Sequence, residues 1–247
     1  MFTTEHFIWI ALCAVFVSGM CCLSVKKRFS LKRAGIIMTA ICALSETNKV
    51  MTGMVDSPGG GIHLDPLCLP LHLCSLLIFA VLYITFGRDG RPKEMWIDFT
   101  AVMGTLGSFC AIMIPTNGTD LTTPFAYQCF VYHAGLMWFS LYLILSGRAK
   151  LGSLKTLGKN IGLLMLLAFV MLYVNGALSV YDTNFFYLTR PPLEGLPYLN
   201  LDRGWYVYLV RIFALGIAAL VLFHLPFLLL DRRKRRRLEE TGQTAYR

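Results

Sequence analysis

Seven long runs of apolar residues divide the chain, and short polar segments separate them. The runs are continuously apolar, whereas the strands of a membrane barrel alternate between apolar and polar positions. Each run is close to the roughly 20 residues that a helix needs to cross a hydrocarbon core of about 30 Å. The runs lie near residues 6–25, 33–53, 66–87, 95–114, 125–146, 160–180 and 205–230. The pattern predicts an all-α polytopic membrane protein whose residues 1–231 form one domain of seven transmembrane helices.

Lysine and arginine gather in alternate loops of this predicted bundle. They are concentrated in residues 26–33, 88–94, 147–159 and 231–237, and the loops between these segments are nearly free of them. Because short cytoplasmic loops carry the excess of positive charge, we expect the N-terminus outside and the C-terminus inside. Residues 232–247 then form a basic cytoplasmic tail, which we expect to bind anionic lipid headgroups and not nucleic acid.

The overall composition excludes an ordinary soluble domain. Hydrophobic residues make up 56% of the 247 residues, charged residues only 15%, and the mean hydropathy is +0.60. The eight cysteines are scattered mostly singly through the apolar runs, where cysteine commonly serves as a small packing residue. We therefore expect neither a disulfide framework nor a cofactor.

Few ionisable or strongly polar side chains lie inside the predicted spans, and most of them fall at one depth. At about 1.5 Å per helical residue, Cys74 and His133 both lie roughly 12 Å below the outer boundary of their spans. Polar groups at this level are costly unless they pair or face a cavity. The candidates near this layer are Glu46, Lys49, His72, Cys74, His133, Asn175 and Arg211. Their convergence predicts a pocket in the outer leaflet, although Lys49 alone is also compatible with snorkelling and Asn175 with interhelical hydrogen bonding.

The stretch "DPLCLPLHLCSLL", residues 65–77, is the most unusual of the spans. On a regular helix His72 and Cys74 would point to opposite sides, so His72 is a poor base for Cys74 and is better suited to orienting or binding a substrate. Pro70 either kinks the span or marks the first turn of a helix that begins inside the membrane. His133, from another helix, is the candidate base for the Cys74 thiol.

The remaining polar groups would assist this pair. Glu46 is the candidate group for orienting the His133 imidazole, and Arg211 or Lys49 for binding a lipid phosphate or a developing oxyanion. The long outer loop, residues 181–204, is rich in aromatic residues and proline. It fits either a lid over the pocket or an interfacial aromatic belt.

The segments "LPLHLCSLL", "VNGALSVYDTNFFYLTRPP" and "DRGWYVYLV" together resemble the YwaF-type family of bacterial integral membrane proteins. That family is similar in turn to the eukaryotic transmembrane protein 164 group, which are polytopic acyltransferases of phospholipid metabolism. More remotely, it is similar to the androgen-induced membrane hydrolases of fatty-acid esters. The resemblance implies a bacterial plasma (inner) membrane location, a membrane phospholipid as substrate, Cys74 as nucleophile and His133 as its partner. Gly204-Trp205-Tyr206 departs from the family's pattern in lacking two prolines.

Three functions remain open from the sequence, beside an assembly factor or scaffold with no chemistry. The first is a lipid acyltransferase or acyl hydrolase that uses Cys74 and His133. The second is a protein that binds or transports a small anionic solute or a lipid, with Arg211 and Lys49 in its pocket and no covalent chemistry. The third is a transition-metal site formed by Cys68, His72, Cys74 and His133, although the C-x3-H-x-C spacing is not a standard ligand pattern.

Overall fold

The computed structural model describes residues 2–56, 60–116, 118–193 and 195–240, and residues 241–247 of the predicted tail lie outside them. The long helices are α1 (Thr4–Lys26), α2 (Leu31–Thr52), α3 (Leu73–Phe86), α4 (Arg91–Met113), α5 (Pro124–Leu145), α6 (Leu154–Ala177) and α7 (Trp205–Glu240). Three short 3-10 helices, η1 (Pro66–Cys68), η2 (Ser179–Tyr181) and η3 (Phe185–Tyr187), lie in the connections. Strands β1 (Met54–Asp56) and β2 (Ile62–Leu64) form a small antiparallel hairpin between α2 and α3. The chain is therefore mainly helical, as predicted.

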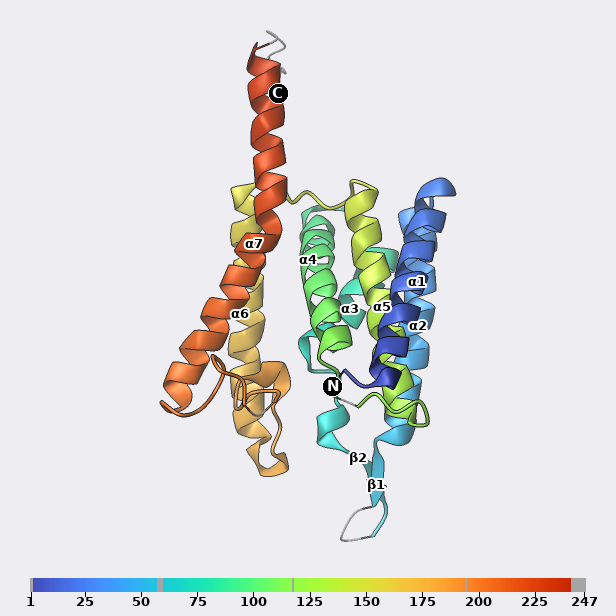
Figure 1. The fold of residues 1–247 in the computed structure, drawn as a ribbon, viewed down its shortest axis with the longest axis vertical. Coiled ribbons are helices and arrows are strands. Elements are labelled where there is room, and N and C mark those ends of the chain that lie inside the picture. The colour runs from blue at the N-terminus through green and yellow to red at the C-terminus, as the bar shows by residue number, and fades with distance from the viewer. Residues whose placement is uncertain (1, 57–59, 117, 194, 241–247) are drawn as a thin grey trace.

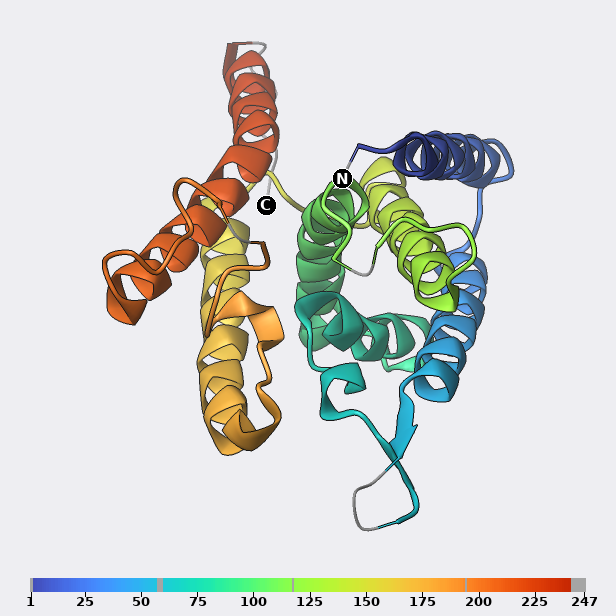
Figure 2. The same cartoon turned by 60° about the horizontal axis from the view of Figure 1, so that its bottom comes forward.

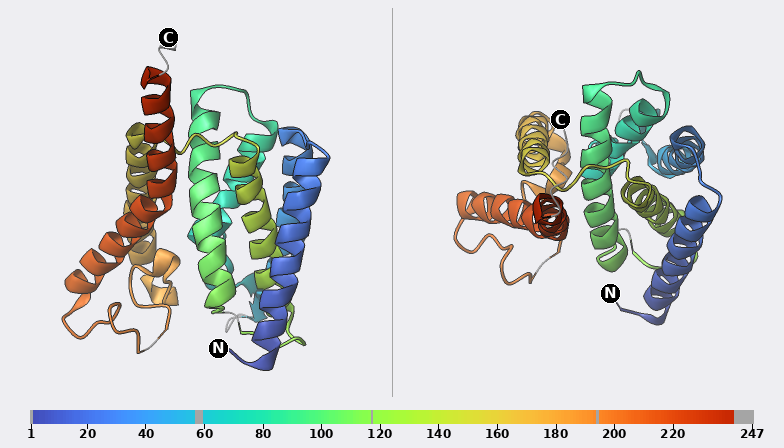
Figure 3. Two further views of the ribbon diagram at one scale, coloured as in Figure 1. Left: turned by 45° about the horizontal axis from the view of Figure 1, so that its top comes forward. Right: turned by 90° about the horizontal axis from the view of Figure 1, so that it is seen from above.

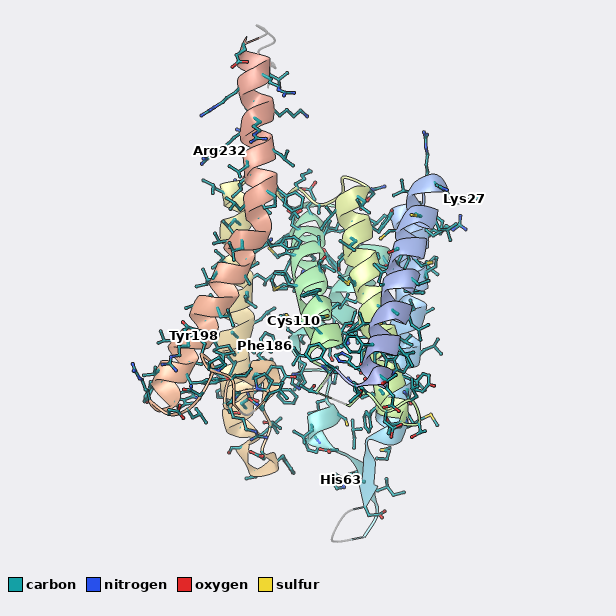
Figure 4. The ribbon with its side chains drawn as sticks, in the orientation of Figure 1. Lys27, His63, Cys110, Phe186, Tyr198 and Arg232 are labelled. Atoms are coloured by element: carbon teal, nitrogen blue, oxygen red, sulfur yellow. The ribbon has the colours of Figure 1, made fainter. Side chains whose placement is uncertain are left out.

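Successive long helices run in opposite directions (Figure 1). Lys27 and Arg232 lie at one end of the molecule, and His63 and Tyr198 lie at the other (Figure 4). The alternation places the four basic segments at one end, which we call the basic end, as the predicted topology requires. The side of the membrane that this end faces stays a prediction.

Five helices, α1, α4, α5, α6 and α7, are long and apolar enough to cross a membrane. Helix α2 has 22 residues but carries Lys32, Arg33, Glu46 and Lys49, and α3 is an apolar helix of only 14 residues. The chain is thus a membrane protein by its helices. The exact number of seven spans stays a prediction.

Helix α5 lies at the centre of a five-helix group and contacts α1, α2 and α4, while α3 packs between α2 and α4. Helices α6 and α7 lie side by side and meet the other helices through α4 (Figures 2 and 3). Small residues allow close approach in the group: a Cβ atom on Gly104 of α4 would lie 2.0 Å from the Ser140 Oγ of α5. Such contacts are typical of helix packing in membranes.

The third span differs from the prediction of one helix over residues 66–87. The chain forms η1, then passes Pro70, and His72 is extended (φ −67°, ψ 152°) before α3 begins at Leu73. A residue before proline avoids helical geometry, which accounts for the extended backbone of Leu69 (φ −59°, ψ 144°) after η1. A helix does begin inside the apolar run, but it begins at Leu73, so Pro70 neither kinks a helix nor lies in the first turn of one.

Helix α7 continues without interruption through Pro226 to Glu240 and extends beyond the other helices at the basic end (Figure 1). The first part of the predicted tail is therefore helical. Near this end His224 is fully buried and joins α7 to α6 and to the α5–α6 loop. Its Nδ1 donates to the Leu151 carbonyl oxygen at 3.0 Å, and its Nε2 accepts from the Asn160 amide at 3.1 Å. This arrangement fixes the imidazole in one neutral tautomer.

Candidate functional site

Cys74 lies in the first turn of α3, at the second helical position. Its thiol packs against α4 at a glycine, since a Cβ atom on Gly107 would lie 3.0 Å from the Cys74 Sγ. The thiols of Cys110 in α4 and Cys129 in α5 are near enough to interact with it electrostatically. Because the helix starts only at Leu73, Cys74 stands at a helix end and not in the middle of a span.

The N-terminus of α3 has no side-chain cap, because His72 occupies the capping position without a hydrogen bond to the backbone. Within the described residues, the backbone N–H groups of Leu73 and Ser75 have no hydrogen-bond acceptor; the first bond of this turn is Leu76 N–H to the His72 carbonyl oxygen, at 2.9 Å. Free N–H groups at a helix N-terminus favour an anion. The thiol of Cys74 is thus adjacent to donors that could bind a negatively charged oxygen.

Helix α5 meets this turn through Tyr132, whose hydroxyl donates to the Cys74 carbonyl oxygen at 2.5 Å. The next residue, His133, is partly exposed, and its ring centre lies 5.2 Å from that of Tyr132. Its Nδ1 donates to the Cys129 carbonyl oxygen at 2.6 Å. Because a carbonyl oxygen only accepts, this bond places the ring proton on Nδ1 and leaves the Nε2 lone pair available as a base.

The described residues contain no direct hydrogen bond between Cys74 and His133. The two residues approach the same region from different helices, with the Tyr132 side chain connecting their backbones. Glu46, the expected partner of the imidazole, instead forms an ion pair with Lys49 at 2.7 Å. The group that orients His133 is therefore a backbone carbonyl and not a carboxylate.

The long loop that follows α6 reaches His72. The His72 ring lies edge-to-face with Phe185 at 5.3 Å between centres, and 5.5 Å from the Tyr187 ring. Residue Tyr187 also meets the α4–α5 loop, because its hydroxyl lies 3.4 Å from the Thr116 Oγ1. The segment 183–190, which we call the aromatic cap, thus covers the start of α3.

Asn175 holds the aromatic cap in place. It is 3% exposed; its amide donates to the Phe185 carbonyl oxygen at 3.0 Å, and its Oδ1 accepts from the Phe185 N–H at 2.8 Å. Asn184 closes the far side, where its Oδ1 accepts from the N–H of Thr189 at 3.1 Å and its amide donates to the Arg190 carbonyl oxygen at 2.9 Å. Both asparagines therefore shape the loop, and Asn175 is a supporting residue that does not approach the thiol directly.

The aromatic cap contains strained backbone. Phe186 and Tyr187 both have positive φ, 60° and 55°, in a region that side chains other than glycine rarely adopt. Helix α7 secures this conformation, since the Tyr208 hydroxyl donates to the Tyr187 carbonyl oxygen and the Trp205 indole N–H donates to that of Leu188 at 2.9 Å. Such strain persists only where the surroundings enforce it, and it is common at functional sites.

Lys49 and Arg211 occupy different places. Lys49 is buried at the end of α2, paired with Glu46, and near enough to interact electrostatically with both His72 and Cys68. Arg211 instead binds the end of the long loop: its Nη1 donates to the Asn200 Oδ1 at 3.0 Å and to the Tyr198 carbonyl oxygen at 3.2 Å. In the view of Figure 4, Tyr198 lies farther from Cys110 than Phe186 does. Lys49 thus interacts with residues beside the start of α3, whereas the hydrogen bonds of Arg211 are with the long loop.

The metal-site hypothesis has no support from the part of the chain that the structure describes, where no group of three or more histidine, cysteine or acidic side chains is arranged to hold an ion. Among the described residues, two hollows at the basic end are lined by residues 24–29 with 142–148 and by residues 230–238, and neither includes Cys74. The outer-leaflet pocket therefore stays a prediction.

Several residues of this region were not predicted from the sequence, above all Tyr132, Gly107 and the pair Phe185 and Tyr187. Tyr132 adjoins His133 in the sequence and could have been noticed as a second polar group at the same depth. The contact at Gly107 depends on which helices are neighbours, and neither spacing nor composition contains that information.

A family model described as the TMEM164 family matches residues 1–225. The chain belongs to the TMEM164 family. The match covers all seven helices as far as the middle of α7 and ends before the basic segment, which confirms the resemblance to the transmembrane protein 164 group. Comparison of this TMEM164 family protein with curated proteins and with solved structures gave no match.

Proposed function

We propose that this TMEM164 family protein transfers or hydrolyses acyl chains of membrane phospholipids through a thioester on Cys74. The observation that carries the proposal is the uncapped first turn of α3, where the Cys74 thiol adjoins backbone N–H groups without acceptors. A nucleophile next to preorganised donors is the arrangement that acyl transfer requires. We further propose that the protein lies in the plasma membrane of a bacterium. We also propose that anionic lipid headgroups bind the basic C-terminal part of α7.

In the first half-reaction, the Nε2 of His133 takes the proton from the Cys74 thiol. The thiolate attacks the carbonyl carbon of a lipid ester, and the negative charge that develops on the carbonyl oxygen is stabilised by the N–H groups of Leu73 and Ser75. The C–O bond of the ester breaks, and the departing lysolipid oxygen takes the proton from His133. The products are an S-acyl Cys74 and a free lysolipid hydroxyl.

In the second half-reaction, His133 deprotonates the hydroxyl of an acceptor lipid or of water, which attacks the thioester carbonyl. The C–S bond breaks, and the Cys74 thiolate regains its proton from His133. The direct contact between His133 and Cys74 forms when substrate closes the site, since catalytic hydrogen bonds often tighten only with a bound substrate. The aromatic cap and His72 then exclude water and bind the lipid beside the thiol.

The test is intact-protein mass spectrometry after incubation of the purified protein with mixed phospholipids. We expect a mass increase that matches a fatty acyl group and is removed by hydroxylamine. It should be absent from Cys74→Ala and His133→Ala, and present in the matched control Cys110→Ser, which changes an exposed thiol beside the same site. An adduct that persists in Cys74→Ala, or no adduct in the folded native protein under rapid quenching, would refute the proposal.

A further inference from the structure

A hollow of about 290 Å³ opens at the basic end, on the opposite side of the molecule from Cys74. It lies between the turn that joins α1 to α2 and the C-terminus of α5. Its polar and aromatic lining residues are Ser24, Arg28, Phe29, Tyr142, Ser146 and Arg148. The site thus combines two guanidinium groups, hydroxyl groups and an apolar wall.

The floor of this hollow is rigid. The Tyr142 hydroxyl donates to the Phe29 carbonyl oxygen at 2.9 Å, and both side chains are buried. This bond joins the turn after α1 to the last turns of α5. The backbone positions of Arg28 and Arg148 are consequently held in fixed register, which lowers the cost of bringing their side chains together on a ligand.

The backbone at Arg28 is strained in a way that helix termination alone does not require. Helices α1 and α5 both end near a residue with positive φ; in α5 it is Gly147 (φ 69°), but in α1 it is Arg28 (φ 45°). Glycine adopts this conformation without penalty, whereas an arginine pays for it. An arginine at a strained position that favours glycine is compatible with a use for its side chain.

Both arginines are available to a ligand. Within the described part of the chain, the guanidinium groups of Arg28 and Arg148 form no ion pair and no hydrogen bond, and no acidic residue lines the hollow. The C-termini of α1 and α5 contribute partial negative charges of about half a unit each. The two arginine charges are larger, so the net charge at the hollow is positive. Guanidinium groups bind phosphate oxygens through paired, charge-assisted hydrogen bonds.

We propose that this hollow binds the phosphate group of an anionic phospholipid from the leaflet at the basic end. A lipid is favoured over a soluble phosphate because exposed apolar side chains, Val25 and Leu145, line the same hollow. These side chains belong to α1 and α5, which are both long and apolar enough to cross a membrane. A lipid headgroup therefore reaches the arginines while its glycerol and upper acyl chain contact the apolar wall. The site is separate from Cys74 and does not depend on the proposed catalysis.

The test is native mass spectrometry of the full-length protein in detergent micelles with equal amounts of dioleoyl-phosphatidylglycerol and dioleoyl-phosphatidylcholine. We expect the native protein to retain phosphatidylglycerol preferentially. Since an arginine near a membrane surface contributes about fivefold to binding of an anionic lipid, Arg28→Gln with Arg148→Gln should remove most of this preference. The matched control, Lys26→Gln with Lys27→Gln, removes the same charge from the adjacent turn and should retain it.

If both double variants lose the preference for phosphatidylglycerol equally, the binding is to a general basic surface and the proposed site is wrong. An unchanged preference in the arginine double variant would also refute the site. Inorganic phosphate that displaces the lipid at equimolar concentration would show a soluble-phosphate site and overturn the lipid assignment. If the arginine double variant does not fold, the native protein is instead crosslinked with a photoactivatable phosphatidylglycerol. Its adducts should map to residues 24–29 and 142–148, and adducts confined to other segments would refute the proposal.

Discussion

Asn175 offers the sharpest test of how the aromatic cap is held. In Asn175→Ala two hydrogen bonds, of 3.0 and 2.8 Å, are lost, and the N–H and carbonyl groups of the buried Phe185 lose their partners. Each unsatisfied buried group costs about 1–3 kcal/mol, so the cap should lose about 2–6 kcal/mol of local stability. At 1.4 kcal/mol per factor of ten, the lower figure corresponds to roughly 30-fold more frequent opening.

Hydrogen–deuterium exchange of the purified protein measures this opening directly. The Phe185 amide, which donates to Asn175, should exchange about 30-fold faster in Asn175→Ala, and the neighbouring amides of the aromatic cap should follow it. Asn48→Ala is the matched control: it removes a single exposed hydrogen bond to the Pro124 carbonyl oxygen at the end of α2.

Exchange of the Phe185 amide that stays within about threefold of the native rate, in a variant that is otherwise folded, would contradict the reasoning. The cap would then be held by α7 through Tyr208 and Trp205, and Asn175 would be only an interhelical polar group. Equal acceleration in Asn48→Ala would show a global loss of stability, and the assignment of Asn175 to the cap would be wrong.

Two further substitutions test the packing. Gly104→Ala should lower the free energy of unfolding by about 1–3 kcal/mol, because its new methyl group would lie 2.0 Å from the Ser140 hydroxyl oxygen. The control Gly158→Ala, which has open space around it, should be neutral or stabilising by up to about 1 kcal/mol. Thermal unfolding in micelles measures both variants, and equal unfolding midpoints would refute the close contact. His224→Ala should lower the unfolding midpoint, because the buried Leu151 carbonyl oxygen and the buried Asn160 amide lose their hydrogen-bond partner, at a cost of about 1–3 kcal/mol each. The control His63→Ala, on the exposed hairpin, should leave the midpoint unchanged.

The sequence predicts much of the fold because transmembrane helices are marked by local apolar composition. The direction of each helix follows from the basic loops, since charge near a span is also a local property. The start of α3 was harder to predict: Pro70 allowed both a kink and a new helix, and only the contacts of the surrounding helices decide between them. The hairpin of β1 and β2 was missed because its strands are only three residues long.

The candidate site was predicted less completely. Counting depth placed Lys49 and Arg211 at about one level, but in the structure only Lys49 is near enough to His72 to interact with it electrostatically. It did not distinguish Arg211, whose side chain turns outward to Tyr198 and Asn200. Depth along a helix does not tell which side of the helix a residue lies on, so residues at the same depth can face different neighbours. The role of Asn175 depends on a loop ten residues away, which no periodicity encodes.

The length of α3 has a consequence for the bilayer around it. Fourteen residues span only about 21 Å, less than the roughly 30 Å of a hydrocarbon core, and the apolar side chains of Phe79, Leu82, Tyr83 and Phe86 form an exposed stripe along this helix. Lipids beside this stripe meet a hydrophobic mismatch, which they relieve by thinning locally. We expect this thinning to bring the ester groups of the leaflet farther from the basic end closer to the first turn of α3. The membrane itself would shorten the path that a lipid travels to Cys74.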